Sequence, residues 1–558
     1  MSTPQAETPA QSPAHSPVEA LKHASRHLRG TLAEELDSPV EGFSKDSETL
    51  LKFHGLYQQK NRDKAEGTPK HPVLMARGRI PGGRLEAAQY LAWDHIANTF
   101  GDGSLRITTR QSLELHGVVK GEAKATLKAL RAALQTTQGA CGDVVRNVTQ
   151  TPNPCGRADL AQLDDVARQL SERFRAYSNA YAEVWLDGEK VDEATEKEPL
   201  LGDAYLPRKF KISVTLAGEN AVDVYTNDLA FAATLKAGRI DGYFVLAGGG
   251  MGMTHNDPTT FPRLADLLGW VPAEALLPVA DAVVGVHRDH GNRGDRRRAR
   301  LKYVIHQRGL DWFRAEVETR AGLVFLDRDL PPWRTTSTLG WLPRVDGTWA
   351  LGLHTLSGRL AGPLKAALRE LVDRHWLAVQ FTPDQDAILV GIPEAAKAEV
   401  DAYFKARGLD IHSPAPLFDR ALACVALPLC GLAITEAERV LPELLALIQS
   451  RLEAHGLADR APVFRVAGCA NGCSRPYAAE FALVGQTPGK YAVYLGGNVE
   501  GTRLAQEVVQ KVPTEALEPF LDQLFSLWKA ASEPDERLGD FAARLGLDTL
   551  KQQLEVIQ

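Results

Sequence analysis

The chain of 558 residues is longer than one hydrophobic core usually organises, so we expect two to four packed units. Hydrophobic residues make up 44% and charged residues 24%, which is typical of a soluble globular protein. The formal net charge of −6 gives no reason to expect a nucleic-acid partner, and no apolar run reaches the roughly 20 residues of a membrane span. We therefore expect neither nucleic acid nor a membrane as a partner.

The N-terminal twenty residues, MSTPQAETPAQSPAHSPVEA, are rich in Pro, Ser and Ala and lack the apolar stretch of a secretory signal. Glu7 and Glu19 both precede the first arginine, Arg26, which does not fit an Arg-rich transit peptide. We expect residues 1–68 to form a flexible N-terminal tail and extension, and the protein to be cytoplasmic.

A weak internal repeat follows. Segments 73–119 and 349–392 each predict a strand, a turn at Gly-Arg-Leu, an amphipathic helix and two further strands. The regions behind them also resemble each other, with YFVLAGGGMG from Tyr243 and YAVYLGGNVEG from Tyr491. Chance agreement of glycine-rich turns is the alternative. We favour a duplication, in which a small α+β unit and a larger α/β unit occur twice.

The two copies differ where binding chemistry is expected. The first has LRITTRQS, with Arg106, Thr108 and Arg110, whereas the second has Thr382-Pro383-Asp384-Gln385 and no arginine there. This difference indicates that the first copy binds an anion and that the second serves as scaffold.

A helix is predicted over residues 433–455 from its apolar periodicity. Thr435 and Glu438 form a possible capping box at its start. Pro442 either moves the true start later or bends the helix.

Four of the six cysteines form two pairs near the C-terminus, Cys424-x5-Cys430 and Cys469-x3-Cys473. Paired ligands of structural zinc usually have two to four residues between them, which the first pair exceeds. A 4Fe–4S cluster needs four thiolates and accepts more varied spacing. A 4Fe–4S cluster is the favoured interpretation, and zinc or four structural thiols are the alternatives. Cys141 and Cys155 we interpret as structural.

The cysteine blocks CVALPLC and VAGCANGCSRP resemble those of the siroheme sulfite and nitrite reductases. Further blocks agree in the family's order: KFHGLYQQKNRD, LRITTRQSLELHG, GACGDVVRNV, YLPRKFK, GGGMGMTH and GNRGDRRRARLKY. The resemblance runs from about residue 20 to the C-terminus. It implies an internally duplicated α+β fold, in which two ferredoxin-like units alternate with two mixed α/β units around a central cofactor site. The expected boundaries are 69–137 and 336–415 for the ferredoxin-like half-domains, 138–335 for the siroheme and substrate domain, and 416–558 for the cluster domain.

The resemblance also implies roles for individual residues. The cluster ligands would be Cys424, Cys430, Cys469 and Cys473, of which Cys473 also ligates the siroheme iron. Arg106, Thr108, Arg110 and Asn471 would bind siroheme, and Arg77, Arg146, Lys209 and Lys211 would hold the oxyanion and help deliver protons. Two positions depart from the family: Ala470 replaces the usual Pro, and Glu114 stands where Gln is more frequent.

The residue types at these positions suit an anionic cofactor and substrate, because buried carboxylates are costly unless they are paired with cations. Lys209 and Lys211 would point to one face of a strand while Phe210 faces a core. Taken alone, a Lys-x-Lys pair is more often a solvated strand face, and a lone His116 is more often structural. The run Arg293–Arg300 stays open between cofactor binding and a solvated face.

We therefore expect the hemoprotein of an assimilatory sulfite reductase, which takes sulfite to sulfide by six electrons at a siroheme coupled to a 4Fe–4S cluster. A nitrite reductase is the rival within the enzyme class, with nitrite otherwise a secondary substrate. A zinc- or cluster-stabilised structural protein is the rival outside it. Gly248-Gly249-Gly250 lacks the Walker and dinucleotide patterns, so electrons must come from a partner protein. A flavoprotein that uses NADPH and a ferredoxin are both possible donors.

Overall fold

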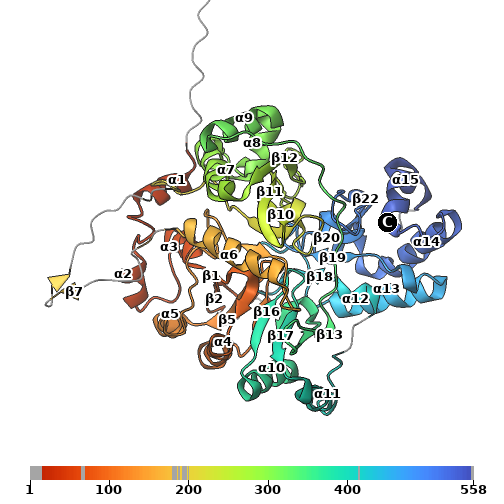
Figure 1. Cartoon of the computed structure of the whole chain (residues 1–558), viewed down its shortest axis with the longest axis horizontal. Helices are drawn as coiled ribbons and strands as arrows, with labels where there is room; N and C mark the ends of the chain where they lie inside the picture. The colour runs from red at the N-terminus through yellow and green to blue at the C-terminus, as the bar shows by residue number, and fades with distance from the viewer. Residues whose placement is uncertain are drawn as a thin grey trace, which may run out of the picture.

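The computed structural model describes residues 15–63, 70–176, 178, 185–186, 189–190, 198, 200–411 and 415–554. Its strands form four five-stranded sheets, and one two-stranded ribbon of β7 (Trp185–Leu186) and β8 (Glu189–Lys190). Two of the large sheets belong to half-domains and two to α/β units, and Figure 1 shows them meeting near the middle of the molecule. In the described part of the chain, no helix has the length and apolarity to cross a membrane.

Much of the segment that we expected to be a flexible extension is folded. It forms α1 (Pro17–Ala24), α2 (Leu32–Asp37), α3 (Lys45–Leu51) and β1 (Leu56–Gln59). Leu28, Leu50 and Phe53 are at most 2% exposed, so burial of these apolar side chains offsets the entropy of ordering the segment. Residues 1–14 and 64–69 lie outside the described residues.

Both half-domains have the element order that the repeat predicts. The first contains β2 (Val73–Arg77), β3 (Arg84–Leu85), α4 (Ala87–Phe100), β4 (Leu105–Ile107), β5 (Leu113–Val118) and α5 (Ala123–Ala132). The second contains β13 (Gly340–Pro343), β14 (Trp349–Leu353), β15 (Arg359–Leu360), α10 (Gly362–His375), β16 (Ala378–Phe381), β17 (Ala387–Ile392) and α11 (Lys397–Lys405).

The two half-domains exchange their Gly-Arg-Leu strands. β15 of the second copy pairs with β4, which places Arg359 opposite Arg106, so the first sheet has the order β1-β2-β5-β4-β15. In return, β3 of the first copy pairs with β16 and completes the order β13-β14-β17-β16-β3. Helices α4 and α10 also meet, and Lys365 Nζ lies 2.7 Å from Asp94 Oδ1. The two halves therefore share one core.

The larger units repeat in the same way. The first contains β6 (Thr149–Gln150), α6 (Ala158–Arg173), β9 (Ile212–Leu216), β10 (Leu229–Lys236), β11 (Arg239–Ala247), β12 (Asp266–Pro272), α7 (Leu276–His290), α8 (Leu301–Arg308) and α9 (Leu310–Ala321). The second contains α12 (Pro416–Asp419), β18 (Leu422–Ala423), α13 (Leu441–His455), β19 (Phe464–Ala467), β20 (Phe481–Thr487), β21 (Lys490–Leu495), β22 (Gln506–Pro513), α14 (Leu517–Ala531), α15 (Leu538–Leu545) and α16 (Leu547–Gln553). In both sheets, β6-β9-β10-β11-β12 and β18-β19-β20-β21-β22, two parallel pairings precede two antiparallel ones. The duplicated α+β fold is confirmed.

The long C-terminal helix α13 starts later than its apolar periodicity suggests. It begins at Leu441 with Pro442 in its first turn, where a missing N–H costs nothing. The capping box was wrong: Thr435 Oγ1 accepts a hydrogen bond from Gly489 N at 3.2 Å, and Glu438 pairs with Arg359 at 2.7 Å. Both side chains instead tie the segment before the helix to neighbouring elements.

Candidate functional site

The four paired cysteines meet at the ends of two neighbouring strands. β18 and β19 run parallel, and the carboxyl ends of parallel neighbours lie at the same edge of a sheet. Cys424 directly follows β18, and Cys469 and Cys473 lie in the loop after β19. Cys469 is buried, Cys424 and Cys430 are half-buried, and Cys473 is exposed. Cys473 is therefore the cysteine that is open to a further ligand.

The surroundings of the thiols suit a metal cluster. Burial, followed by the charge of Cys473, raises the pKa of Cys424, and the same causes raise the pKa of Cys469 to about 11. Thiols with raised pKa values become thiolates only beside positive charge, which cluster iron would supply. Within the described ranges, no three His, Cys, Asp or Glu side chains converge closely enough to hold one metal ion.

Nitrogen donors already approach two of the sulfurs. Gly468 N lies 3.3 Å from Cys424 Sγ, and Asn471 Nδ2 lies 3.6 Å from Cys469 Sγ. A Cβ at Gly468 would lie 2.6 Å from Thr435 O, so only glycine fits there. Hydrogen bonds to sulfur of this kind tune iron–sulfur clusters. Ala470, in place of the family's Pro, is held by its carbonyl, which accepts from Met253 N at 3.0 Å and Tyr477 Oη at 3.1 Å.

A group of cations, Arg77, Arg146, Lys209 and Lys211, lies on the side of the exposed Cys473 and is called the cation wall below. Residues 143–146 pair with 206–211, because Phe210 N donates to Val144 O at 3.0 Å and Arg146 N donates to Phe210 O at 2.9 Å. Phe210 is buried, as its alternation with the lysines predicts. Among the described residues, the ammonium groups of Lys209 and Lys211 have neither a hydrogen-bond nor an ion-pair partner. These two cations are available to an anion.

The electrostatics connect the two lysines to Cys473. Burial, then the charges of Arg208 and Arg146, lower the pKa of Lys209 to about 7, and a Cys473 thiolate opposes that shift. Burial followed by Arg300 and Lys209 lowers the pKa of Lys211 as well, again opposed by Cys473. The first α/β unit therefore places its unpaired ammonium groups within electrostatic reach of the thiol that the second unit exposes.

Arg77 lies at the end of β2 and is fixed by three neighbours. Its Nε donates to Glu114 Oε1 at 2.7 Å, its Nη1 donates to Cys141 Sγ at 3.0 Å, and its guanidinium lies 5.7 Å from the centre of the Tyr57 ring. Burial alone would raise the pKa of Glu114, but Arg77 and His116 lower it below its usual value. Glu114 is therefore ionised and neutralised within the protein, and Cys141 is a neighbour of a candidate catalytic residue.

Three of the residues expected to bind siroheme, Arg106, Thr108 and Arg110, differ in availability. Arg106 is engaged by protein groups: Nη2 donates to Ala423 O at 3.0 Å, and Nε lies 3.1 Å from Glu438. Thr108 Oγ1 accepts from the backbone of Arg110 at 3.1 Å and thereby shapes the turn. Arg110 donates to neutral acceptors, Asn227 Oδ1 at 2.5 Å and the carbonyls of Asn147 and Ile212 at 2.6 Å. Arg110 thus keeps a positive charge at the site.

The sequence did not single out several residues that hold the parts of the site together. Thr109 Oγ1 donates to Cys473 O at 3.3 Å, and Arg475 Nη1 donates to Thr109 O at 3.2 Å. Asp228, fully buried, accepts from Arg300 Nη2 at 2.6 Å and from Lys211 N at 2.9 Å. Thr109 and Arg475 lie in family blocks, whereas Asp228 lies in none of them, and a lone Thr or Asp carries no pattern of its own.

The run Arg293–Arg300 divides between several roles. Arg293 and Arg296 pair with Glu19 and Asp143, and Arg300 pairs with Asp228. Arg297 and Arg298 are 59% and 41% exposed. Neither a continuous cofactor surface nor a solvated face describes the whole run.

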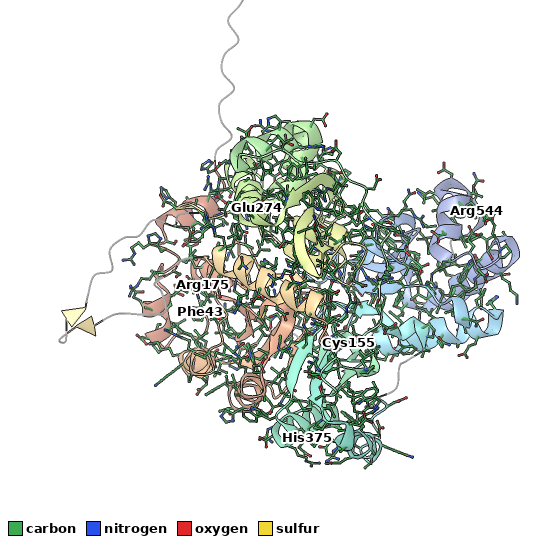
Figure 2. The ribbon with its side chains drawn as sticks, in the orientation of Figure 1. Phe43, Cys155, Arg175, Glu274, His375 and Arg544 are labelled. Atoms are coloured by element: carbon green, nitrogen blue, oxygen red, sulfur yellow. The ribbon has the colours of Figure 1, made fainter. Side chains whose placement is uncertain are left out.

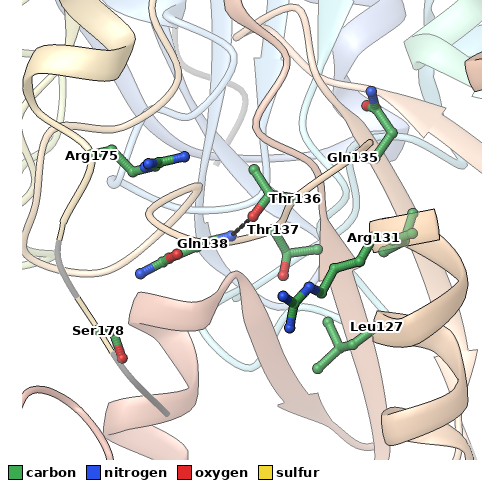
Figure 3. Close-up of a pocket in the computed structure, with 9 residues that line it drawn as sticks. Leu127, Arg131, Gln135, Thr136, Thr137, Gln138, Arg175 and Ser178 are labelled. Carbon is green, nitrogen blue, oxygen red and sulfur yellow. Dashed lines mark hydrogen bonds between the residues drawn. The ribbon is translucent and has the colours of Figure 1, made fainter. Parts of the chain in front are cut away.

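A cavity of about 290 Å³ lies apart from the cysteines and the cation wall, beside α5. Figure 3 shows Arg131, Arg175, Thr137 and Gln138 around it. Its lining includes no residue of the predicted site. Cys155, labelled in Figure 2, also lies elsewhere, where its carbonyl accepts from Val345 N at 3.0 Å and joins the two copies.

Comparisons with known proteins agree with this arrangement. The model of the nitrite and sulphite reductase 4Fe-4S domain matches residues 167–325 and 420–557, and the model of the nitrite/sulfite reductase ferredoxin-like half domain matches 69–133 and 343–407. A sulfite reductase [NADPH] hemoprotein beta-component of Myxococcus xanthus is 42% identical over 94% of this chain and 96% of its own length. A sulfite reductase [ferredoxin] of Synechococcus elongatus is 40% identical over 96% of this chain and 90% of its own. The solved structure of the Mycobacterium tuberculosis NirA protein has the same fold, with a TM-score of 0.78 at 24% identity over 95% of this chain and 96% of its own.

Proposed function

The chain belongs to the nitrite and sulphite reductase family, and we propose that it is the hemoprotein of an assimilatory sulfite reductase. Its substrate is sulfite, which it reduces to sulfide, and nitrite is a secondary substrate. The observation that carries this proposal is the pair of unpartnered ammonium groups, Lys209 and Lys211, facing the exposed Cys473.

The proposed cofactors are a 4Fe–4S cluster on Cys424, Cys430, Cys469 and Cys473, and a siroheme that shares Cys473. Support for the siroheme comes from the donor set around that thiol, because an anionic macrocycle needs cations such as Arg110 that have no carboxylate of their own. When bound, the two groups supply a store of electrons and an iron that holds the substrate.

The protein's own groups bind and protonate the substrate. Lys209, Lys211 and Arg146 attract a dianion, and hydrogen bonds from their N–H groups hold its oxygens. With a pKa near 7, the Lys209 ammonium is also a proton donor suited to a reaction that releases oxygen as water. Arg77 completes the wall, in an orientation that Glu114 and Cys141 fix.

Sulfite is favoured over nitrite because it carries two charges and has more oxygens to accept hydrogen bonds. Two neighbouring ammonium groups repel each other in the empty site, and a dianion relieves that repulsion more fully than a monoanion. The electrons come from a partner protein, because the chain lacks the Walker and dinucleotide patterns. An NADPH-linked flavoprotein and a ferredoxin are both candidates, since relatives of the two types are about equally similar.

Two measurements test the proposal. An optical spectrum of the purified protein should show the Soret and long-wavelength bands of a siroheme, together with iron and sulfide for one cluster. Steady-state kinetics with a small artificial reductant should give a higher kcat/KM for sulfite than for nitrite. A colourless protein, or nitrite as the better substrate, would contradict it. Turnover with reduced ferredoxin against NADPH plus a flavoreductase then identifies the donor.

A further inference from the structure

A buried ion-pair network connects helix α1 to the cation wall. Lys22 Nζ lies 2.5 Å from Glu19 Oε1 and 3.6 Å from Asp143 Oδ2, and it donates a hydrogen bond to Leu206 O at 2.8 Å. The side chains of Lys22, Glu19 and Asp143 are 0%, 2% and 4% exposed. A surface helix would normally leave such charges in water, so their burial here needs an explanation.

The two acceptors outside α1 stand at the start of the segments that form the wall. Asp143 lies three residues before Arg146, and Leu206 lies three residues before Lys209. Leu206 N also donates to Asp143 O at 3.0 Å, which begins the ladder that continues through Phe210. Lys22 thus contacts both residues of the first backbone hydrogen bond between the two segments that carry Arg146 and Lys209.

Lys22 links both carboxylates of the network to the backbone of Leu206. Burial alone would raise the pKa of Asp143, but Lys22 and then Arg296 lower it below its usual value. Arg296 donates to both oxygens of Asp143, at 2.7 and 3.1 Å, and Arg293 pairs with Glu19. Without Lys22, Arg293 and Arg296 would still pair with Glu19 and Asp143, but the hydrogen bond from α1 to Leu206 O would be lost.

We propose that Lys22 and Glu19 are positioning residues for oxyanion reduction, which act through Asp143 and Leu206 on the placement of Arg146 and Lys209. This inference rests on the proposed function. It gives α1, which contains no group near the cysteines, a part in the reaction rather than only in stability.

The test compares Lys22→Met with a matched control, Lys365→Met. Lys365 is likewise buried and paired with a carboxylate, but it joins α4 to α10, neither of which contains a residue of the cation wall. We expect Lys22→Met to lower kcat/KM for sulfite roughly tenfold to a hundredfold, the usual effect of a small misplacement of binding groups, at unchanged cofactor content. Lys365→Met should lose a similar amount of thermal stability but keep kcat/KM within about twofold.

A double variant separates positioning from general damage. If Lys22 acts through Lys209, then Lys22→Met combined with Lys209→Met should lose little more than Lys209→Met alone, whereas independent effects would multiply. Multiplied losses, or full activity in Lys22→Met, would overturn the inference. If Lys22→Met does not assemble with its cofactors, Glu19→Gln, which preserves the contact with Leu206, takes its place in the same cycle. Full sulfite activity in Lys209→Met itself would instead count against the proposed function.

Discussion

Replacing Lys209 by Met should have opposite effects on activity and on stability. Burial, followed by the charges of Arg208 and Arg146, lowers the pKa of this ammonium from 10.5 to about 7, and no carboxylate partner offsets them. Methionine has a similar length and no charge, so it removes both the hydrogen bond to the oxyanion and the repulsion in the empty site. Lys209→Met should therefore reduce sulfite less well and unfold at a higher temperature.

The magnitudes follow from two separate energies. A charge-assisted hydrogen bond contributes about 1.5–3 kcal/mol, which corresponds to a loss of roughly 10-fold to 150-fold in kcat/KM for sulfite. Nitrite, with one charge, should lose several-fold less. The lowered pKa of Lys209 corresponds to a cost on the order of 2–4 kcal/mol for holding the charged form at pH 7, after a discount for partial exposure to solvent. The cofactor-free variant should gain a good part of this energy.

The assay pairs steady-state kinetics on the loaded enzyme with thermal unfolding of the cofactor-free protein. Lys236→Met is the control, since Lys236 is exposed at the end of β10 and should alter neither quantity. A Lys209→Met protein that is less stable than the parent would refute the electrostatic argument. Equal losses for sulfite and nitrite would refute the argument about substrate charge.

Three further outcomes are expected. Cys473→Ser should abolish both the cluster absorbance and the siroheme bands, with loss of bound iron, whereas Cys155→Ser should leave both unchanged. Glu114→Gln should destabilise the protein by about 1–3 kcal/mol in thermal unfolding while lowering the KM for sulfite, because Arg77 loses its neutralising partner; an increased KM would contradict this. His54 is buried and burial lowers its pKa to about 4, so the unfolded chain takes up the proton first and stability falls as the pH drops from about 6.5 towards 4. At pH 5.5 this loss amounts to about 1.4 kcal/mol, and His54→Gln, which can still donate to Leu28 O, should remove that part of the pH dependence of unfolding; an unchanged slope would argue against it.

Periodicity predicted the elements of the fold better than their ends or their partners. The strand, turn, helix and two strands of each half-domain lie where the pattern of apolar residues places them, because that pattern records which face is buried. The exchange of β3 and β15 was not predictable, since two-residue strands have no period and their pairing is decided by the other copy. The predicted capping box was wrong because Thr435 and Glu438 bind Gly489 and Arg359, which are distant in sequence, instead of the start of the helix.

The cysteine spacing predicts a cluster site, and the i and i+2 spacing of Lys209 and Lys211 predicts a shared face; both stay predictions. Their nearness to Cys473 depends on contacts between units more than 250 residues apart in sequence, which no local pattern records. The engagement of Arg106 by Glu438 belongs to the same class. The folding of residues 17–63 was missed because their Pro- and Ser-rich start hid a small set of buried leucines and phenylalanines.

The exchanged strands also bear on the history of the duplication. A second copy that had lost its arginines could be deleted from a protein whose repeats folded separately, because nothing would then depend on it. Here deletion would remove the edge strand β15 on which Arg359 lies opposite Arg106, and would leave β3 without a sheet to join. Each copy therefore needs the other in order to complete its own sheet. Selection acting on the first copy's site alone is then enough to preserve both.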